Sequence, residues 1–171
     1  MSPPGRPKGE YGSAQHEGIP VSTVAPLDHD AIAGLIPHAG RMCLLARVDA
    51  WDARTIRCTA TGHADADHPL RSASGLLAST AIEYAAQAAA VHGALNARAA
   101  GHSAAPGFLA SARGVRLHRL RLDELAGELA IETEHLAGHD RQLLYAFTVR
   151  HEGATVADGR LAVVLDTPLP A

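Results

Sequence analysis

The sequence predicts an α+β domain in which an antiparallel β-sheet wraps around one long central helix. The helix is predicted over Gly75–Arg98, a stretch of alanine and other good helix formers that contains no proline and is apolar around most of its circumference. Several shorter segments on both sides of this stretch alternate apolar and polar residues, as strands do. Because the helix is the only predicted element large enough to cover the apolar face of such a sheet, the two are expected to pack together.

Composition places the chain among ordinary globular proteins with one domain. It has 171 residues, of which 47% are apolar, and a net charge of −3 that gives no reason to expect nucleic acid as a partner. Its two cysteines, Cys43 and Cys58, are expected to be reduced and buried, as in a cytosolic protein. No apolar run approaches the roughly 18 residues that span a bilayer, and the N-terminus carries no secretory signal. A cytoplasmic location without a membrane span is therefore expected.

The N-terminal part is predicted to contain a tail, a short helix and two strands. Met1–Pro26 is rich in proline, glycine and serine and is expected to be a disordered tail, which leaves 27–171 as a single domain. Asp28 is placed to cap a helix that ends before Pro37. Two strands and a polar loop are then expected at Met42–Val48, Thr55–Thr61 and Gly62–Ser74.

The rest of the chain is predicted to consist of the long helix and four strands. Ser72 or Ser74 is the expected N-cap of the helix, and a loop of small residues, Ala99–Ala105, follows its end. The strands are predicted at Gly107–Leu122, Gly127–Leu136, Arg141–His151 and Thr155–Leu165, with turns between them that carry glycine. The alternation changes parity within the first strand, which predicts a bulge or bend near His118–Arg119.

One face of the predicted helix carries a short polar stripe. Thr80, Glu83 and Gln87 lie at i, i+3 and i+7, and Val91 and Ala94 continue the same face as apolar residues. A solvated face would stay polar to the end of the helix, so the stripe indicates a local polar pocket. Two interpretations of Glu83 remain open: a general acid in that pocket, or a carboxyl group that faces a gap between elements or caps a loop.

Four local motifs occur in an order that is familiar from one enzyme family. They are Ile36-Pro37-His38 with Leu44-Leu45 and Arg47-Val48, then His68-Pro69, then Glu83 with Gln87, and then the basic stretch Val115–Arg119. Together they resemble the β-hydroxyacyl-(acyl carrier protein) dehydratases of fatty acid synthesis, which have the hotdog fold. Within that group, His63–Arg71 and Ile82–Leu95 are most similar to the dehydratase-like proteins of aryl polyene-type pathways. The resemblance extends from about Leu35 to Leu165.

This resemblance implies a reaction and roles for individual residues. The implied reaction converts 3-hydroxyacyl thioesters on acyl carrier protein to trans-2-enoyl thioesters. It implies that His68 removes the proton beside the thioester carbonyl and that Glu83 protonates the departing hydroxyl group. The implied substrate-binding residues, which include helix-start amides that would hold the thioester oxygen, are Leu77, Ala78, Ser79, Thr80 and Gln87. The family takes histidine and acid from opposite subunits, so a site across a dimer interface is also implied.

The resemblance further implies two protein partners and no cofactor. One partner is an acyl carrier protein with a phosphopantetheine-linked acyl chain. The other is a hotdog subunit, in a homodimer or in a heterodimer with a homologous protein. Carrier-protein docking is expected at Arg113, Arg116, Arg119 and Arg121, for which a solvated strand face is the alternative. A non-catalytic subunit that supports an active partner, and an acyl thioesterase on the same fold, remain alternative functions.

The sequence also allows expectations for one loop and two further histidines. The loop His63–His68 has residue types that bind metals but no established ligand spacing, so a solvated loop with one functional histidine is expected instead. His38 is interpreted either as a structural histidine or as a contact of the site. His92 is expected to be buried and hydrogen-bonded within the helix environment.

Overall fold

A computed structural model describes residues 26–139 and 141–165 of the chain. The described strands and helices are β1 (Leu27–Asp28), α1 (His29–Ala33), β2 (Arg47–Trp51), β3 (Thr55–Ala60), α2 (Ala81–Ala99), β4 (Gly107–Leu117), β5 (Leu129–His139), β6 (Gln142–His151) and β7 (Ala154–Leu165). Short 3-10 turns occur at Gly40–Met42, Gly62–Ala64 and Ala78–Thr80. The side chain of Asp28 caps α1 by accepting a hydrogen bond from the N–H of Ala31, as expected.

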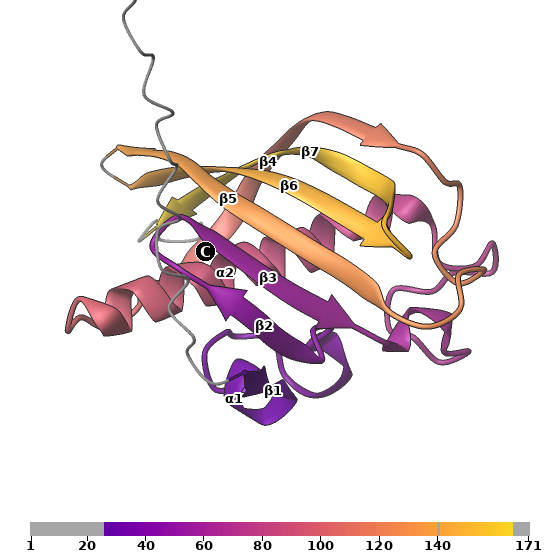
Figure 1. The fold of residues 1–171 in the computed structure, drawn as a ribbon, viewed down its shortest axis with the longest axis horizontal. Helices are drawn as coiled ribbons and strands as arrows, with labels where there is room; N and C mark the ends of the chain where they lie inside the picture. Colours follow the sequence, from indigo (N-terminus) through magenta and orange to yellow (C-terminus); the bar gives the residue numbers. More distant parts are fainter. Residues whose placement is uncertain (1–25, 140, 166–171) are drawn as a thin grey trace, which may run out of the picture.

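The seven described strands form one antiparallel sheet in the order β1-β2-β3-β5-β6-β7-β4. In Figure 1, α2 crosses one face of the curved sheet, and α1 lies beside β1 and β2. β5, β6 and β7 are joined by successive hairpins, whereas β3 pairs with β5 although α2 and β4 separate them in the sequence. This architecture confirms the predicted antiparallel sheet around one central helix.

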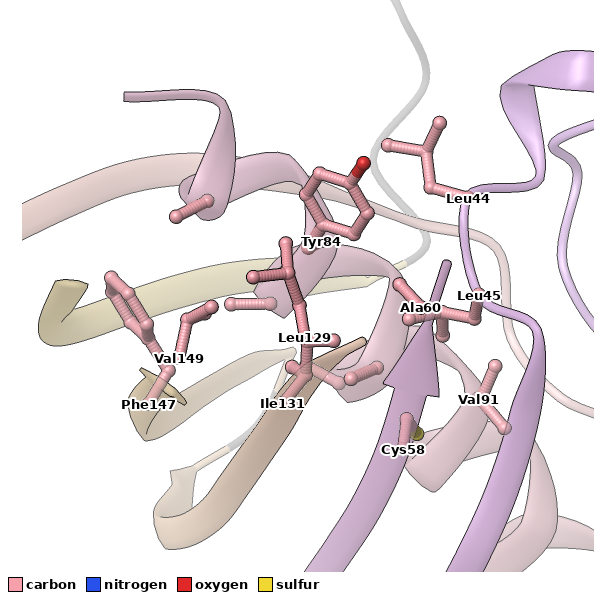
Figure 2. Close-up of a cluster of buried hydrophobic side chains, with 14 of the residues drawn as sticks. Leu44, Leu45, Cys58, Ala60, Tyr84, Val91, Leu129, Ile131, Phe147 and Val149 are labelled. Atoms are coloured by element: carbon pink, nitrogen blue, oxygen red, sulfur yellow. The ribbon is translucent and has the colours of Figure 1, made fainter. Parts of the chain in front are cut away.

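The hydrophobic core lies between α2 and the inner face of the sheet (Figure 2). Alternate strand residues point toward the helix, among them Ile56, Cys58 and Ala60 of β3, Leu129 and Ile131 of β5, and Tyr145, Phe147 and Val149 of β6. α2 meets them with Tyr84, Val91, Leu95 and several fully buried alanines. The small alanine side chains let the strands approach the helix backbone closely, which gives the core its packing density.

The predicted strand Met42–Val48 is wrong over most of its length, because β2 begins only at Arg47. In the chain before it, Ala46 donates its N–H to the carbonyl of Thr59 in β3 (2.8 Å), whereas Met42 and Leu44 are bound to α2. The backbone N–H of Leu44 donates to the Oε1 of Gln87 (2.9 Å), and the carbonyl of Met42 accepts from the Nε2 of the same side chain (2.8 Å). These backbone groups are therefore unavailable for a sheet ladder.

The long helix also begins later than predicted, and neither Ser72 nor Ser74 caps it. α2 starts at Ala81, and Thr80 in the N-cap position makes no side-chain capping bond. The residues just before the 3-10 turn are extended and paired with a segment from the other half of the chain, so they are not free to join a helix.

We call this pairing of residues 76–78 with residues 120–122 the clasp. Two backbone hydrogen bonds of 2.8 and 2.9 Å join its segments and fix the start of α2. Gly75 precedes the clasp with a φ of +92°, and a Cβ atom there would overlap the guanidinium group of Arg121. Only glycine combines that backbone conformation with the space that Arg121 needs.

Two of the C-terminal strands differ from prediction at their ends. β4 stops at Leu117, because the residues that follow turn away and form the clasp. Its pairing with β7 shifts register around Gly114, where φ is +59°, so the irregularity lies before the predicted His118–Arg119. β5 continues to His139, where a turn was expected. β6 and β7 agree with prediction to within one residue.

Some expectations concern residues at or beyond the described ranges. The predicted tail, 1–26, lies outside them apart from Pro26, and the single domain over 27–171 stays a prediction. Within the described ranges, Cys43 and Cys58 are both free and buried. No helix of the described residues is both long enough and apolar enough to cross a bilayer.

We predict that Gly75→Ala lowers the free energy of unfolding by about 2 kcal/mol or more, because a side chain fits neither the positive φ nor the contact with Arg121. Gly93→Ala is the matched control. Gly93 lies inside α2 with open space at its Cβ position, so this change is expected to raise stability by about 0.5–1 kcal/mol. Urea unfolding measures both values. Equal midpoints for the two variants would show that the clasp does not constrain Gly75.

Candidate active site

Glu83 lies in the first turn of α2 and faces His38, which comes from the chain between α1 and β2. The Oε1 of Glu83 is 3.1 Å from the Nε2 of His38. The two side chains are 31% and 30% exposed, so the contact is neither buried in the core nor fully solvated. A substrate can therefore reach both side chains from outside the protomer.

Gln87 holds Glu83 and the chain around Met42 in place through its side-chain amide, which is fully buried. Its Oε1 accepts from the backbone N–H of Leu44, so its Nε2 must be the donor to the Met42 carbonyl and to the Oε1 of Glu83 (2.9 Å). Glu83 and Gln87 thus form one hydrogen-bonded cluster. Thr80, the third residue of the stripe, stays outside it and donates its hydroxyl to the carbonyl of Leu77 (2.6 Å).

His38 has one ring nitrogen without a partner. Its Nδ1 is buried and makes no hydrogen bond to any described residue, whereas its Nε2 contacts Glu83. A hydrogen bond between an imidazole nitrogen and a carboxyl oxygen requires one proton between the two atoms, and either residue can carry it. The pair can therefore take up a proton at one position and release one at the other.

His68 lies elsewhere in the described chain, and no hydrogen bond or ion pair joins it to Glu83. It is 6% exposed, its Nδ1 accepts from the N–H of Leu70 (3.1 Å), and its Nε2 is 3.0 Å from the hydroxyl of Tyr84. Burial lowers the pKa of His68, which favours a neutral ring that donates from Nε2 to Tyr84. Neither nitrogen is then free to accept a proton. The expected encounter of His68 with Glu83 of a neighbouring subunit stays a prediction.

A polar hollow of about 560 Å³ adjoins His68 and Tyr84. Arg41 and Asp67 form an ion pair in its wall, and Asp65 also lines it. The loop that was expected to be solvated is therefore partly internal. Its first histidine, His63, is fully buried and bonded through Nε2 to the carbonyl of Leu125 (2.8 Å).

The described residues contain no group of three or more His, Cys, Asp or Glu side chains that could hold a metal ion. His92 is fully buried and has both ring nitrogens bonded. Its Nε2 donates to the carbonyl of Asp52 (2.8 Å), so its Nδ1 accepts from the hydroxyl of Tyr145 (3.1 Å). This confirms the expectation of a buried, hydrogen-bonded histidine.

The backbone amides that were expected to bind the thioester oxygen lie at the clasp and in the 3-10 turn before α2. The N–H of Ala78 donates to the carbonyl of Leu120, and the N–H of Thr80 donates to the carbonyl of Leu77, so these two donors are occupied. Among the described residues, no acceptor is assigned to the N–H groups of Leu77 and Ser79. These are the two amides that a ligand at the helix start can reach without displacing a hydrogen bond.

A shallow hollow of about 430 Å³ lies beside these amides, lined by Leu77, Ser79 and residues 117–120. Leu77, Leu117 and Leu120 are exposed large apolar residues around it. Arg119 lies in its wall, and no ion pair to Arg119 is formed within the described residues. The helix start thus combines free N–H groups, exposed apolar side chains and one unpaired cation.

The four arginines expected to dock a carrier protein do not form one cluster of free charges. Arg116 is bonded to Asp158 (2.9 Å), and Arg121 is bonded to Asp123 (2.6 Å). Arg113 lies on β4 directly opposite Arg160 of β7, and neither forms an ion pair with a described residue. Arg119 lines the hollow at the helix start, and Arg121 lies in the clasp, where Asp123 already neutralises it.

The contact of His38 with Glu83 is the feature of the site that the sequence indicated least well. Forty-five positions separate it from Glu83, the difference between 83 and 38, so helix periodicity carries no information about their contact. The signal that pointed to it was the Ile36-Pro37-His38 motif, which left a structural role and a site role open. The structure places His38 in contact with Glu83.

Comparison with solved structures supports the fold. The dehydratase heterocomplex ApeI:P from Xenorhabdus doucetiae matches with a TM-score of 0.71 and 23% identity, over 82% of this chain and 92% of that chain. The PaaI protein of the E. coli phenylacetic acid degradation operon matches with a TM-score of 0.53 and 14% identity, over 80% and 88%. AziG from S. sahachiroi gives 0.52 and 16%, over 77% and 97%. At these identities the matches establish the hotdog fold alone.

Sequence comparison gives the family. No curated protein sequence matches the chain significantly. A family model described as ApeP-like, ApeP dehydratase, matches residues 30–169, which include His38, Glu83 and Gln87 and nearly all of the described fold. The match agrees with the resemblance drawn from the sequence motifs. The chain therefore belongs to the ApeP-like dehydratase family.

Proposed function

We propose that the chain dehydrates 3-hydroxyacyl thioesters carried on acyl carrier protein to trans-2-enoyl thioesters, with Glu83 and His38 as the catalytic pair. The observation that carries this proposal is the 3.1 Å contact between the two side chains in a partly exposed position on α2. Membership of the ApeP-like dehydratase family supports the reaction type. Dehydration needs a base and an acid close together, and the contact supplies both.

The proposed mechanism balances protons within the pair. Neutral His38 takes the proton from the carbon beside the thioester carbonyl, and protonated Glu83 gives its proton to the departing hydroxyl group. A double bond and water form, which leaves His38 protonated and Glu83 ionised. Because the two atoms lie 3.1 Å apart at rest, the proton returns directly from His38 to Glu83 when product leaves. Each turnover then requires no net proton exchange with solvent.

The helix start is the proposed position of the thioester group. Ser79 lies in the 3-10 turn that leads directly into α2, about one turn before Glu83. The free N–H groups of Leu77 and Ser79 would bind the carbonyl oxygen as negative charge develops on it. Arg119 would bind the phosphate of the phosphopantetheine arm, which makes it the docking arginine that matters most.

A hotdog partner subunit is part of the proposal. β4 is an edge strand of the sheet, and its end residues Phe108 and Leu117 are 40% and 47% exposed. An exposed apolar edge strand favours pairing with another chain. The similar ApeI:P structure is a heterocomplex, which supports a homologous partner for this chain as well.

A non-catalytic subunit is the second candidate function, and the heterocomplex formed by the similar structure is the observation in its favour. In that case the chain would stabilise a partner that carries the reactive residues. The two candidates differ in whether activity depends on Glu83 of this chain. Hydrolysis of the thioester, the reaction of a thioesterase, would be recognised by release of the free thiol.

We predict that Glu83→Gln and His38→Gln each lower kcat by about a hundredfold or more, the scale expected for loss of a general acid or base. His102→Ala, at an exposed histidine outside the site, is the matched control and should keep the parent rate. Formation of the enoyl thioester is followed by ultraviolet absorbance with a 3-hydroxyacyl thioester substrate, for the chain alone and with a homologous partner. Thermal unfolding checks that each variant is folded.

The same experiment separates the competing interpretations. A His68→Asn variant that loses activity while His38→Gln remains active would identify His68 as the base and contradict the role of His38. Full activity of Glu83→Gln in complex with an active partner would support the non-catalytic subunit. Loss of enoyl thioester formation in the Glu83→Gln and His38→Gln variants, with His68→Asn still active, would support the proposed mechanism.

We predict that Arg119→Ala raises KM for a substrate on carrier protein by about tenfold, because one charge-assisted contact to phosphate is lost. Arg116→Ala is the control, since Asp158 already neutralises Arg116. KM for a short thioester that lacks the phosphopantetheine phosphate should be unchanged in both variants. An equal increase for Arg116→Ala and Arg119→Ala would contradict a specific role for Arg119.

We predict that the chain assembles through β4. In sedimentation at micromolar concentration, the chain or its mixture with a homologous hotdog protein should give a species heavier than the 17.8 kDa monomer. Leu117→Glu adds a charge to the exposed apolar edge and should weaken assembly. A monomer under all conditions would remove the partner subunit from the proposal.

A further inference from the structure

A buried carboxylate that the proposed mechanism does not use lies directly beside the clasp. The side chain of Asp123 is only 2% exposed, and Asp123 follows the clasp segment 120–122 in the sequence. Its Oδ1 accepts from the Nε of Arg121 (3.0 Å), and its Oδ2 accepts from the Nη2 of the same guanidinium group (2.6 Å). Burial of a carboxylate is costly unless polar partners surround it, and Arg121 is one of several such partners here.

Asp123 joins three segments of the chain that are separate in the sequence. Arg121 belongs to one segment of the clasp. The backbone N–H of Leu76, in the other segment of the clasp, also donates to the Asp123 carboxylate. The Nη2 of Arg71 is 2.9 Å from the Oδ2 of Asp123, and Arg71 belongs to the loop that carries His68. One side chain therefore links this loop to both segments of the clasp and, through them, to the start of α2.

The contact with Asp123 holds Arg71 in a position that has a cost. The N–H of Arg71 donates to the carbonyl of His68 (3.0 Å), which closes a turn in the loop. The Nη1 of Arg71 is buried and has no hydrogen-bond partner among the described residues. An unpaired buried N–H group costs free energy. Arg71 keeps this position nevertheless, which indicates that its ion pair with Asp123 outweighs that cost.

Asp123 stays negatively charged at neutral and mildly acidic pH. The hydrogen bonds from Arg121 and the positive charge of Arg71 hold the pKa of its carboxyl group well below the ordinary value, although burial acts in the opposite direction. Its hydrogen bonds are therefore charge-assisted and about twice as strong as neutral ones. Bonds of this strength resist the local opening that is common at loops and at the ends of helices.

We propose that Asp123 is a positioning residue for the reaction, because it holds the start of α2 with the N–H groups of Leu77 and Ser79 in place for the thioester oxygen. The effect on catalysis rests on the proposed function, which assigns that oxygen to these two amides, whereas the effect on the clasp does not. Donors that stabilise an oxyanion must lie about 2.7–3.1 Å from it. A clasp that opens, even briefly, loses this geometry.

The first measurement is amide hydrogen exchange by NMR on the full chain, which requires no activity. Asp123→Asn keeps the shape of the side chain and removes its charge. Ala78 and Leu122 donate the two hydrogen bonds of the clasp, so their amides should exchange at least about tenfold faster in this variant. Arg71→Gln removes one contact and leaves Arg121 to neutralise Asp123. It should give a smaller increase, and it serves as the test if Asp123→Asn does not fold.

Two controls separate positioning from a general loss of stability. Ile131→Val removes a buried methyl group from β5 and lowers the stability of the whole fold. It should leave exchange of the clasp amides at the parent rate, because Ile131 stays packed when only the clasp opens. Glu128→Gln removes a carboxylate that two hydrogen bonds join to Arg47 outside the clasp. This variant should also leave exchange of the clasp amides unchanged.

The second measurement connects the clasp to the proposed site. Acetyl-N-acetylcysteamine, a thioester that cannot be dehydrated, should shift the amide resonances of Leu77 and Ser79 in the parent chain. In Asp123→Asn these shifts should fall to about half or less. With a 3-hydroxyacyl substrate, Asp123→Asn should lower kcat by about tenfold or more and change KM by less than about threefold, because the amides bind the developing oxyanion more tightly than the ground-state carbonyl. Glu128→Gln should keep both kinetic constants.

Two outcomes would overturn the proposal. Clasp exchange at the parent rate in both Asp123→Asn and Arg71→Gln would show that Asp123 does not hold the helix start. An equal increase for Asp123→Asn and Ile131→Val would show a general effect on stability. Faster clasp exchange in the Asp123 variant, in a chain without dehydratase activity or without shifts at Leu77 and Ser79, would support the hold of Asp123 on the helix start and contradict the proposed function alone.

Discussion

The amide side chain of Gln87 is the contact on which the site depends. It is fully buried: its Oε1 accepts from the backbone N–H of Leu44, and its Nε2 donates both to the carbonyl of Met42 and to Glu83. A buried amide that lost any of these partners would carry an unpaired polar group, which costs about 1–3 kcal/mol. The same bonds hold the chain that leads from His38 against α2. Core packing and the geometry of the proposed catalytic pair are therefore fixed by one residue.

Local patterns predicted the elements that local contacts stabilise. β6 and β7 form a hairpin whose alternation is visible in the sequence, and both were predicted to within one residue. α2 is apolar and alanine-rich, and its end was predicted to within one residue, although it starts six residues later than predicted. The prediction failed where distant segments compete for backbone groups. Residues 76–78 have the composition of a helix but pair with 120–122, and the segment around Leu44 has the composition of a strand but is bonded to Gln87. Neither partner can be inferred from nearby residues.

The same distinction applies to the candidate site. Glu83 and Gln87 share a helix face, and their spacing alone indicated a common polar environment. His38 joins them through the path of the chain between α1 and β2, which no periodicity describes. His68 has the residue type expected of a base, but within its own chain its Nε2 is bonded to Tyr84 and its Nδ1 to the N–H of Leu70, and its encounter with Glu83 of a neighbouring subunit stays a prediction. Residue type indicated the chemistry, and tertiary packing determined which histidine meets the acid in one chain.

The position of β5 in the sheet has a consequence for how the chain is made. β5 pairs with β3 on one side and β6 on the other, yet it follows α2 and β4 in the sequence. During synthesis, α2 leaves the ribosome after β3 but before the other strands that cover it, and its apolar surface has no complete sheet to pack on until β5, β6 and β7 have emerged. Pairing across such a separation is slow compared with hairpin closure. The growing chain therefore passes through a stage in which an apolar helix is exposed, when chaperones or an already folded partner would protect it best.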